Sequence, residues 1–266
     1  MSIEKINYVW LVFHYETNKL TNLTGRREDK ENSKASTVFK YTTASIKTFI
    51  DHNPDKINDI IVYTDDLDLI EKNIKEYINK KINLVDIKEK IDIWKKCDYP
   101  WYPKTAFLKD IHEINSSILF IDNDCICRES VDPLVEKIKD GKSVILWEPE
   151  REISNTRPYW GWQKTTNYLD RPSSYWVYND GIIGINKKQI NEGIFKKSHD
   201  MCLDVWNNVD ITDIPGRPSD YIPKRVFIAQ QIAICFTCQD ENLDLVESRK
   251  YFHHFYSNKL ECLKYL

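Results

Sequence analysis

Continuous runs of apolar residues alternate along the chain with segments whose apolar residues recur every three or four positions. Continuous runs are typical of buried strands, and they lie at residues 8–13, 59–64, 82–87, 117–121, 143–147 and 181–186. The recurring spacing predicts helices at 38–50, 67–78, 104–114, 132–138, 189–209 and 225–238. This alternation predicts an α/β fold with a mixed, mainly parallel central sheet.

Three segments interrupt the alternation. Residues 16–34 are polar and too long for an ordinary connection, so we expect them to be mobile or to cover a site. Residues 91–103 read as irregular, and residues 148–178 are rich in Trp and Tyr. Neither an internal repeat nor a linker divides the sequence, which predicts a single domain over residues 1–266.

The composition narrows the functional classes. A net charge of -3 and a pI near 6.1 give no electrostatic footprint for nucleic acid. No apolar run approaches the roughly 20 residues of a membrane span, and the first residues lack the order of a signal peptide. We therefore expect a cytoplasmic protein, with contact at the inner face of a membrane left open. The odd count of 7 cysteines favours small buried thiols in a reducing compartment.

The clearest chemical feature is a pair of carboxylates after a strand. Asp122 and Asp124 flank Asn123 directly after the apolar run 118–121. In open α/β sheets, ligands bind at the carboxyl ends of strands. Hard oxygen ligands of this kind suit Mg²⁺ or Mn²⁺, which bridge diphosphate oxygens. The alternative is a polar turn, for which Asn and Asp are common.

Residues 118–134, ILFIDNDCICRESVDPL, resemble the aspartate motif of glycosyltransferases with the GT-A fold, especially those of the glycogenin and lipopolysaccharide-galactosyltransferase type and related capsule-sugar transferases. Four further elements occur in the family's order: an apolar first strand that ends in Phe13-His14-Tyr15, and the segments YPKTAFLKD, YNDGIIGIN and RKYFHHF. The sequence departs from the family where Gln230-Gln231 replaces an acid–Gln pair and where a Gly-Lys-Pro-Trp-like sequence is absent.

This resemblance implies a single GT-A-like domain whose residues 1–147 bind a nucleotide sugar and whose residues 148–266 bind the acceptor. It implies transfer of a hexosyl unit, most simply from a UDP-sugar to a glycan or other hydroxyl, in polysaccharide biosynthesis. Retention of configuration is implied; inversion would require Asp180, Glu148 or Asp220 as a base that deprotonates the acceptor. The alternatives are a sugar-phosphate nucleotidyltransferase, which usually has a Gly-rich basic signature near its N-terminus, and a catalytically silent carbohydrate-binding protein.

The resemblance also implies a metal site for Mn²⁺ or Mg²⁺. Asp122 would contact the ribose and the metal, and Asp124 would bind the metal. His253 or His254 would complete the site, with His253 favoured; the alternative for both is a partly buried aromatic cluster. Four further residues would lie beside the donor: His14, Tyr15, Asp65 and Asn123.

Four polar residues are candidates for contact with the sugar. Lys104 would contact the donor sugar and Asp122, or it is a solvated surface lysine. Asp180 would contact a sugar hydroxyl, or it serves an ordinary turn. Gln231 lies on an apolar helical stripe, where a buried amide needs a partner, either a backbone group or a ligand. Gln230 directly precedes Gln231, and the resemblance implies that the two together occupy the family's donor-sugar positions.

The aromatic segment offers a surface for the acceptor. Trp160, Trp162 and Trp176 fit a carbohydrate platform, because sugar C–H faces pack on aromatic rings. The equal alternative is that these rings cover the core.

Overall fold

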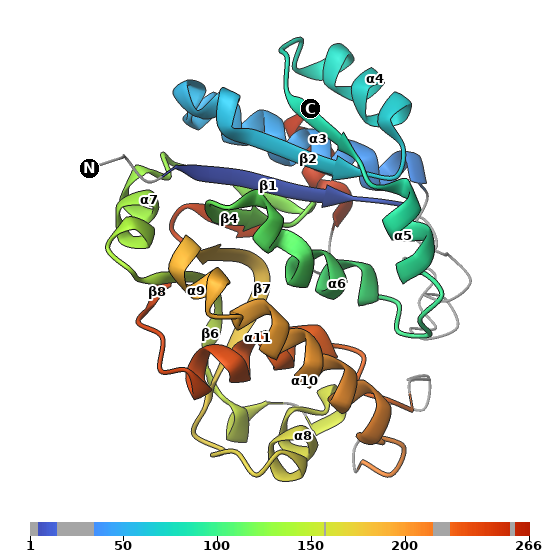
Figure 1. The fold of residues 1–266 in the computed structure, drawn as a ribbon, viewed down its shortest axis with the longest axis vertical. Coiled ribbons are helices and arrows are strands. Elements are labelled where there is room, and N and C mark those ends of the chain that lie inside the picture. Colours follow the sequence, from blue (N-terminus) through green and yellow to red (C-terminus); the bar gives the residue numbers. More distant parts are fainter. Residues whose placement is uncertain (1–4, 15–34, 157, 215–223, 256–258) are drawn as a thin grey trace.

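The computed structural model describes residues 5–14, 35–156, 158–214, 224–255 and 259–266. Its centre is a seven-stranded sheet of order β3-β2-β1-β4-β7-β6-β8 (Figure 1). The strands of this sheet are β1 (Ile6–Val12), β2 (Ile60–Thr64), β3 (Asn83–Asp86), β4 (Ser117–Ile121), β6 (Ser143–Glu152), β7 (Trp176–Ile185) and β8 (Leu245–Glu247).

The predicted mixed, mainly parallel sheet is confirmed. β1 pairs in parallel with both β2 and β4, and β2 pairs in parallel with β3. β7 is antiparallel to β4 and to β6, whereas β8 is parallel to β6. The carboxyl ends of β1, β2 and β4 therefore meet at one edge of the sheet, the edge that binds ligands in open α/β folds.

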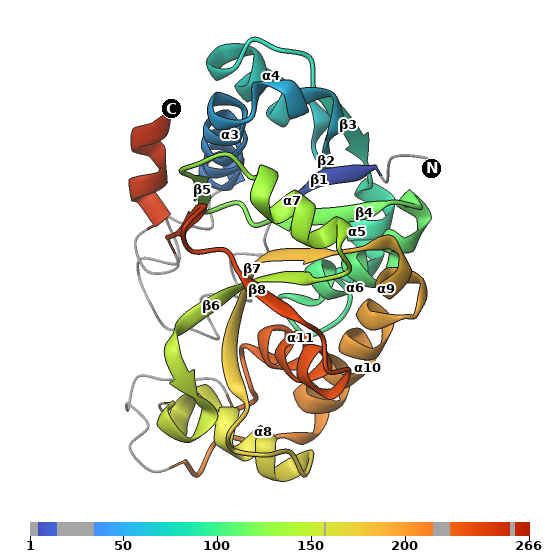
Figure 2. The ribbon, with the colours of Figure 1, turned by 90° about the vertical axis from the view of Figure 1, so that its left-hand side faces the viewer.

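Helices cover both faces of the sheet (Figures 1 and 2). Along β1, Val9 and Leu11 pack on one face and Trp10 and Val12 on the other, so this strand is buried on both sides. The first face lies against α5 (Lys88–Trp94), α6 (Tyr102–Asp110), α9 (Lys187–Asn191), α10 (Ile194–Asn208) and α11 (Ala229–Asp240). The second lies against α3 (Ala35–His52), α4 (Leu67–Tyr77) and α7 (Asp132–Lys139).

The aromatic segment contains more regular structure than the sequence predicts. β6 continues to Glu152 and β7 begins at Trp176, so the two strands form a long antiparallel pair with register shifts. Short 3-10 turns (Ile153–Asn155, Pro158–Trp160) and α8 (Trp162–Tyr168) connect them. The prediction of an irregular segment over 91–103 is also partly wrong, because α5 extends to Trp94. The predicted loop at 16–34 lies outside the described residues.

A second, two-stranded sheet returns the end of the chain to the region after β4. β5 (Cys125–Cys127) pairs with β9 (Phe252–His254) in antiparallel register. The final 3-10 helix (Lys259–Tyr265) packs against α3 (Figure 2). Two further 3-10 helices, Pro54–Asp59 and Ile111–Ile114, precede β2 and β4. The tail thus lies beside the carboxylates that follow β4.

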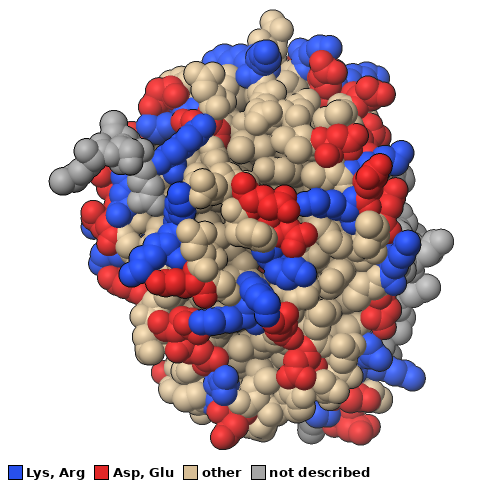
Figure 3. Space-filling model, viewed as in Figure 1, with Lys and Arg blue, Asp and Glu red and all other residues tan. Residues whose placement is uncertain are grey.

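The distribution of charged side chains on the surface agrees with the small net charge of -3. Acidic and basic side chains are interspersed over the face in Figure 3. Within the described ranges, no helix is both long enough and apolar enough to cross a bilayer.

Candidate active site

The turn after β4 projects its carboxylates into a buried environment. β4 is fully buried, and the backbone N–H of Asp122 donates to the carbonyl of Gly181 on β7 at 2.8 Å. The chain then turns, with the N–H of Cys125 donating to the carbonyl of Asp122 at 3.1 Å. Asp124 is 3% exposed, too little for a solvated turn residue.

Lys104 joins two of the predicted site residues. It lies in the first turn of α6, and its Nζ donates to Oδ2 of Asp122 at 2.9 Å. The same Nζ is 2.9 Å from the carbonyl oxygen of Asp180 and 3.1 Å from Oδ2 of Asp180. The residue is 8% exposed, which excludes a solvated surface lysine. The structure thus brings Lys104, Asp122 and Asp180 into one ion-paired group.

Asp124 carries a second group of charges. Nε2 of His254 is 3.1 Å from its Oδ1, and Nζ of Lys259 is 2.5 Å from its Oδ2. The sequence favours His253 as the third ligand, but it is the imidazole of His254 that lies beside Asp124. Neighbouring residues of a strand face opposite sides, and the ring of His253 instead packs edge-on against Phe255, with ring centroids 4.2 Å apart.

The two groups interact electrostatically. The pKa of Asp122 is raised by burial and by the negative charges of Asp124 and Asp180. Together these effects outweigh the positive charge of Lys104, which lowers it. Burial would also raise the pKa of Asp124, but the charges of Lys259 and His254 outweigh it and hold that pKa well below its ordinary value. The same Asp124 charge raises the pKa of His254 against the effect of burial.

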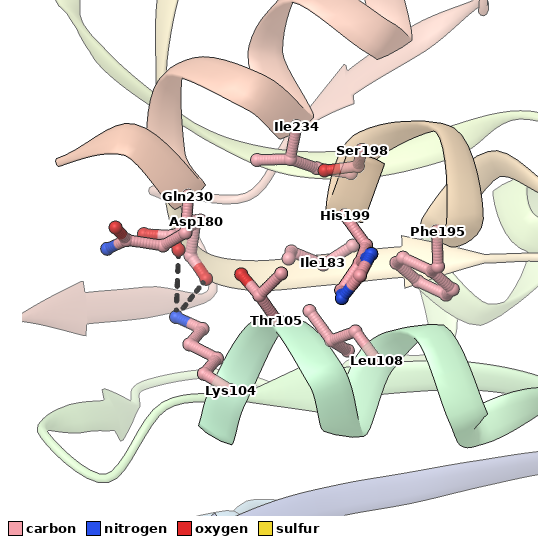
Figure 4. A pocket seen from close by; sticks show the side chains of 10 residues that line it. All are labelled: Lys104, Thr105, Leu108, Asp180, Ile183, Phe195, Ser198, His199, Gln230 and Ile234. Atoms are coloured by element: carbon pink, nitrogen blue, oxygen red, sulfur yellow. Dashed lines mark hydrogen bonds and ion pairs between the residues drawn. The ribbon is translucent and has the colours of Figure 1, made fainter. Parts of the chain in front are cut away.

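A small pocket opens beside Lys104 and Asp180 (Figure 4). Asp180 and Gln230 lie at one end of it, facing Lys104 on α6, and His199 from α10 lies toward the other end. Its volume of about 10 Å³ holds about one water molecule. Gln230 is therefore the member of the glutamine pair that borders the pocket.

Gln231 and Asn123 have partners within the protein. Nε2 of Gln231 donates to the carbonyl of Tyr178 on β7 at 2.8 Å, the backbone alternative anticipated for this buried amide. Oδ1 of Asn123 accepts from the hydroxyl of Thr42 on α3 at 3.0 Å. Both side chains thus connect the strands of the site to neighbouring helices.

The residues expected near the nucleotide form a separate cluster on the same sheet edge. The backbone N–H of His14 donates to both carboxylate oxygens of Asp65, each at 3.1 Å, and Lys95 lies 2.8 Å from Oδ2 of Asp65. Nε2 of His14 is 2.9 Å from Asp66. Tyr15 lies outside the described residues.

The three platform tryptophans do not share one environment. Trp162 is 3% exposed and packs against Phe236 in the core, so its expected place on a binding surface is wrong. Trp160 is partly buried against that core, whereas Trp176 is 38% exposed.

Two residues of the site were missed from the sequence. Lys259 lies in a tail without a clear period, and nothing in the sequence connects it with Asp124. Tyr99 is buried; its hydroxyl accepts from the N–H of Gln230 at 3.0 Å and also contacts the side-chain oxygen of Gln230. The run Tyr99-Pro100-Trp101-Tyr102-Pro103 was a usable signal, since such a dense aromatic and proline stretch is typical of a fixed, packed loop.

Comparisons with known proteins give a result at the level of the fold. No protein-family model matches the chain, and no curated protein matches its sequence. Solved structures do match: mouse xyloside xylosyltransferase 1 has a TM-score of 0.52 at 9% identity, over 91% of this chain and 84% of that one. The bifunctional glycosyltransferase WbbM has a TM-score of 0.50 at 11% identity, over 98% of this chain and 44% of that one.

The galactosyltransferase LgtC, whose structure holds donor and acceptor sugar analogues, has a TM-score of 0.49 at 14% identity, over 87% of this chain and 70% of that one. Similarity at such low sequence identity establishes the fold and nothing finer. The chain has the GT-A fold of glycosyltransferases.

Proposed function

We propose that the chain is a metal-dependent glycosyltransferase that moves a hexosyl unit from a UDP-sugar to a glycan or other hydroxyl acceptor with retention of configuration. One observation carries the proposal. Two carboxylates, Asp122 and Asp124, follow β4 at the ligand-binding edge of a GT-A sheet, and each is held by charged partners from other elements.

The residues present fit a divalent cation. Asp122, Asp124 and His254 offer two carboxylates and an imidazole. This set of ligands suits Mn²⁺ better than Mg²⁺. Burial and the negative charges of Asp124 and Asp180 raise the pKa of Asp122 despite the nearby Lys104, so a cation beside this carboxylate would be favoured. When bound, the metal would neutralise the charge that develops on the leaving diphosphate.

The remaining residues would orient the donor. Lys104 holds the carboxylates of Asp122 and Asp180 in fixed positions. Asp180 and Gln230 border the pocket, where Asp180 would accept hydrogen bonds from sugar hydroxyls and Gln230 would accept or donate them. His14 and Asp65 would lie on the nucleoside side of the site, as would Tyr15, the residue directly after His14. Asn123 and Gln231 would support the site through Thr42 and the backbone of Tyr178.

The acceptor would bind on the part formed by residues 148–266. The half-exposed ring of Trp176 and the partly buried ring of Trp160 are the aromatic candidates that remain for sugar stacking. A glycan acceptor fits a role in polysaccharide biosynthesis in the cytoplasm, with residues 1–147 serving the nucleotide sugar.

Calorimetric titration of UDP into the purified protein tests the metal bridge. We expect tighter UDP binding with Mn²⁺ than with EDTA, because the metal connects the carboxylates to the diphosphate. His254→Ala should reduce this difference, whereas His253→Ala, a matched change one residue away, should preserve it. Equal UDP affinity with Mn²⁺ and with EDTA in the wild-type protein would exclude the metal bridge.

A further inference from the structure

One ligand type at this site was not expected from the family. Asp124, Cys125 and His254 each offer a ligand atom, and these atoms all lie within 4.8 Å of one another. Oδ1 of Asp124 and Nε2 of His254 are 3.1 Å apart. Donor atoms that share a tetrahedral zinc ion at about 2.0–2.3 Å are about 3.3–3.6 Å apart, so small movements suffice to enclose an ion.

The pairing of β5 with β9 holds the thiol and the imidazole on one side of the small sheet. Cys125 lies directly opposite His254 in the antiparallel register, and side chains of directly opposed residues share a face. The backbone N–H of Phe255 donates to the carbonyl of Asp124 at 3.0 Å, which fixes the third residue against the same strand pair. The arrangement therefore depends on backbone hydrogen bonds rather than on flexible side chains.

Gly181 leaves room beside this cluster. A Cβ atom at this position would lie 3.1 Å from Sγ of Cys125 and 3.3 Å from Cε1 of His254, closer than ordinary contact. A side chain here would thus press the thiol and the imidazole out of place. The carbonyl of Gly181 accepts from Sγ of Cys125 at 3.5 Å and also from the N–H of Asp122, so it keeps a partner when the thiol proton is lost.

We propose that Asp124, Cys125 and His254 form a site for a zinc-like divalent cation, with the Cys125 thiolate as one of its three protein ligands. The inference rests on the proposed function for a metal site after β4. It keeps Asp124 and His254 as ligands, takes Cys125 in place of Asp122, and changes the class of metal. Oxygen, nitrogen and sulfur ligands together suit Zn²⁺ and its analogues Co²⁺ and Cd²⁺ better than Mn²⁺ or Mg²⁺. On binding, a metal–sulfur bond replaces the S–H bond, the proton leaves to solvent, and the oxidation state of the metal is unchanged.

Affinity alone does not test this proposal, because most nitrogen and oxygen sites already bind Zn²⁺ more tightly than Mn²⁺. The direct readout is the absorption of a sulfur–cobalt charge-transfer band when Co²⁺ is titrated into EDTA-treated protein without nucleotide. We expect the band in the wild type and in Cys127→Ser, and its loss in Cys125→Ser. Cys127 is the matched control, because it is a buried cysteine on the same strand and belongs to no such cluster among the described residues.

Zinc binding gives the quantitative prediction: Cys125→Ser should weaken Zn²⁺ binding at least about tenfold relative to Cys127→Ser. If Cys125→Ser does not fold, X-ray absorption of the zinc-loaded wild type decides the question, with one sulfur expected at about 2.3 Å from the metal. A first shell of only nitrogen and oxygen, or a cobalt band that persists in Cys125→Ser, overturns the proposal.

These outcomes are separable from the test of the proposed function. The cobalt and zinc measurements are made without nucleotide, whereas the proposed function is tested by UDP binding with Mn²⁺. A site without sulfur that still binds UDP through Mn²⁺ contradicts only the present inference. A sulfur-containing site in a protein that binds no nucleotide contradicts only the proposed function.

Discussion

Lys104 holds Asp180 by two atoms: its ammonium nitrogen lies 2.9 Å from the carbonyl oxygen and 3.1 Å from Oδ2 of that residue. The same nitrogen is bonded to Asp122, so one cation connects α6, β7 and the turn after β4. Lys104 should therefore contribute to the stability of the folded protein as well as to the chemistry of the site.

Replacing Lys104 with methionine should therefore destabilise the protein. The change leaves two largely buried carboxylates without their cation, and breaking a buried ion pair by removing one partner costs about 3 kcal/mol. Lys109→Met on the same helix is the control, because that lysine is a third exposed and lies 4.0 Å from Asp110; it should cost less than about 0.5 kcal/mol. Urea unfolding of both variants measures the difference, and equal free energies of unfolding would contradict the buried ion-paired group.

Trp162 and Trp176 should respond in opposite ways to substitution with alanine. Trp162→Ala removes a core ring beside Phe236 and should cost about 3–5 kcal/mol of stability. Trp176→Ala should cost much less and, if its ring stacks on the acceptor, should raise the acceptor KM roughly several-fold to tenfold. Thermal melting and acceptor kinetics on the two variants check this. A stable Trp162→Ala protein would contradict the core assignment, and an unaltered acceptor KM in Trp176→Ala would remove that residue from the acceptor site.

Tyr99 should act through Gln230. Tyr99→Phe removes the acceptor for the partly buried N–H of Gln230 and a partner of its side chain, and the loss should cost about 1 kcal/mol. Because Gln230 borders the pocket, the donor KM should rise while the acceptor KM stays constant. Tyr168→Phe, which removes an exposed hydroxyl bonded to Asp204, is the control. A normal donor KM in Tyr99→Phe would mean that Gln230 does not depend on this hydroxyl.

Asp66 provides a pH-dependent test away from the carboxylates after β4. Its side chain accepts from the N–H of Leu69 at the start of α4 and contacts His14. Burial opposes ionisation, but these hydrogen bonds outweigh it and lower the pKa of Asp66. A carboxyl whose folded pKa is depressed stabilises the protein above its unfolded pKa, near 4, and this contribution is lost as the pH falls through the folded pKa. Asp66→Ala should cost about 1 kcal/mol at pH 7 and less at pH 3. A cost independent of pH would contradict the ionised cap.

The parts of the fold that the sequence predicts well are those in which one local signal decides the structure. The runs around Trp10 and Phe120 are apolar on both faces, and only a buried strand accommodates such a pattern in an α/β chain. The aspartates after β4 were likewise visible because a carboxylate pair after such a strand is unusual.

Other parts depend on contacts between distant segments. The early start of β7 includes Asn179 and Asp180, which are turn formers by local preference and become strand residues only through pairing with β6. The choice between His253 and His254 depends on the register of β9 against β5, and a shift of one residue exchanges the two faces. Lys259 reaches Asp124 across 135 positions of sequence, for which no local pattern exists.

The most direct test of the central claim is the release of nucleoside diphosphate, measured by mass spectrometry after incubation with a panel of nucleotide sugars and Mn²⁺. The wild type should release UDP from at least one UDP-sugar, and EDTA should stop the release. Asp122→Asn should lose the activity, with its melting temperature reported alongside because Asp122 also pairs with Lys104. Asp92→Asn, an exposed change on α5, should behave as the wild type. Release that continues in EDTA or in Asp122→Asn would contradict the metal-bound diphosphate at the end of β4, and no release from any nucleotide sugar would contradict the proposed function itself.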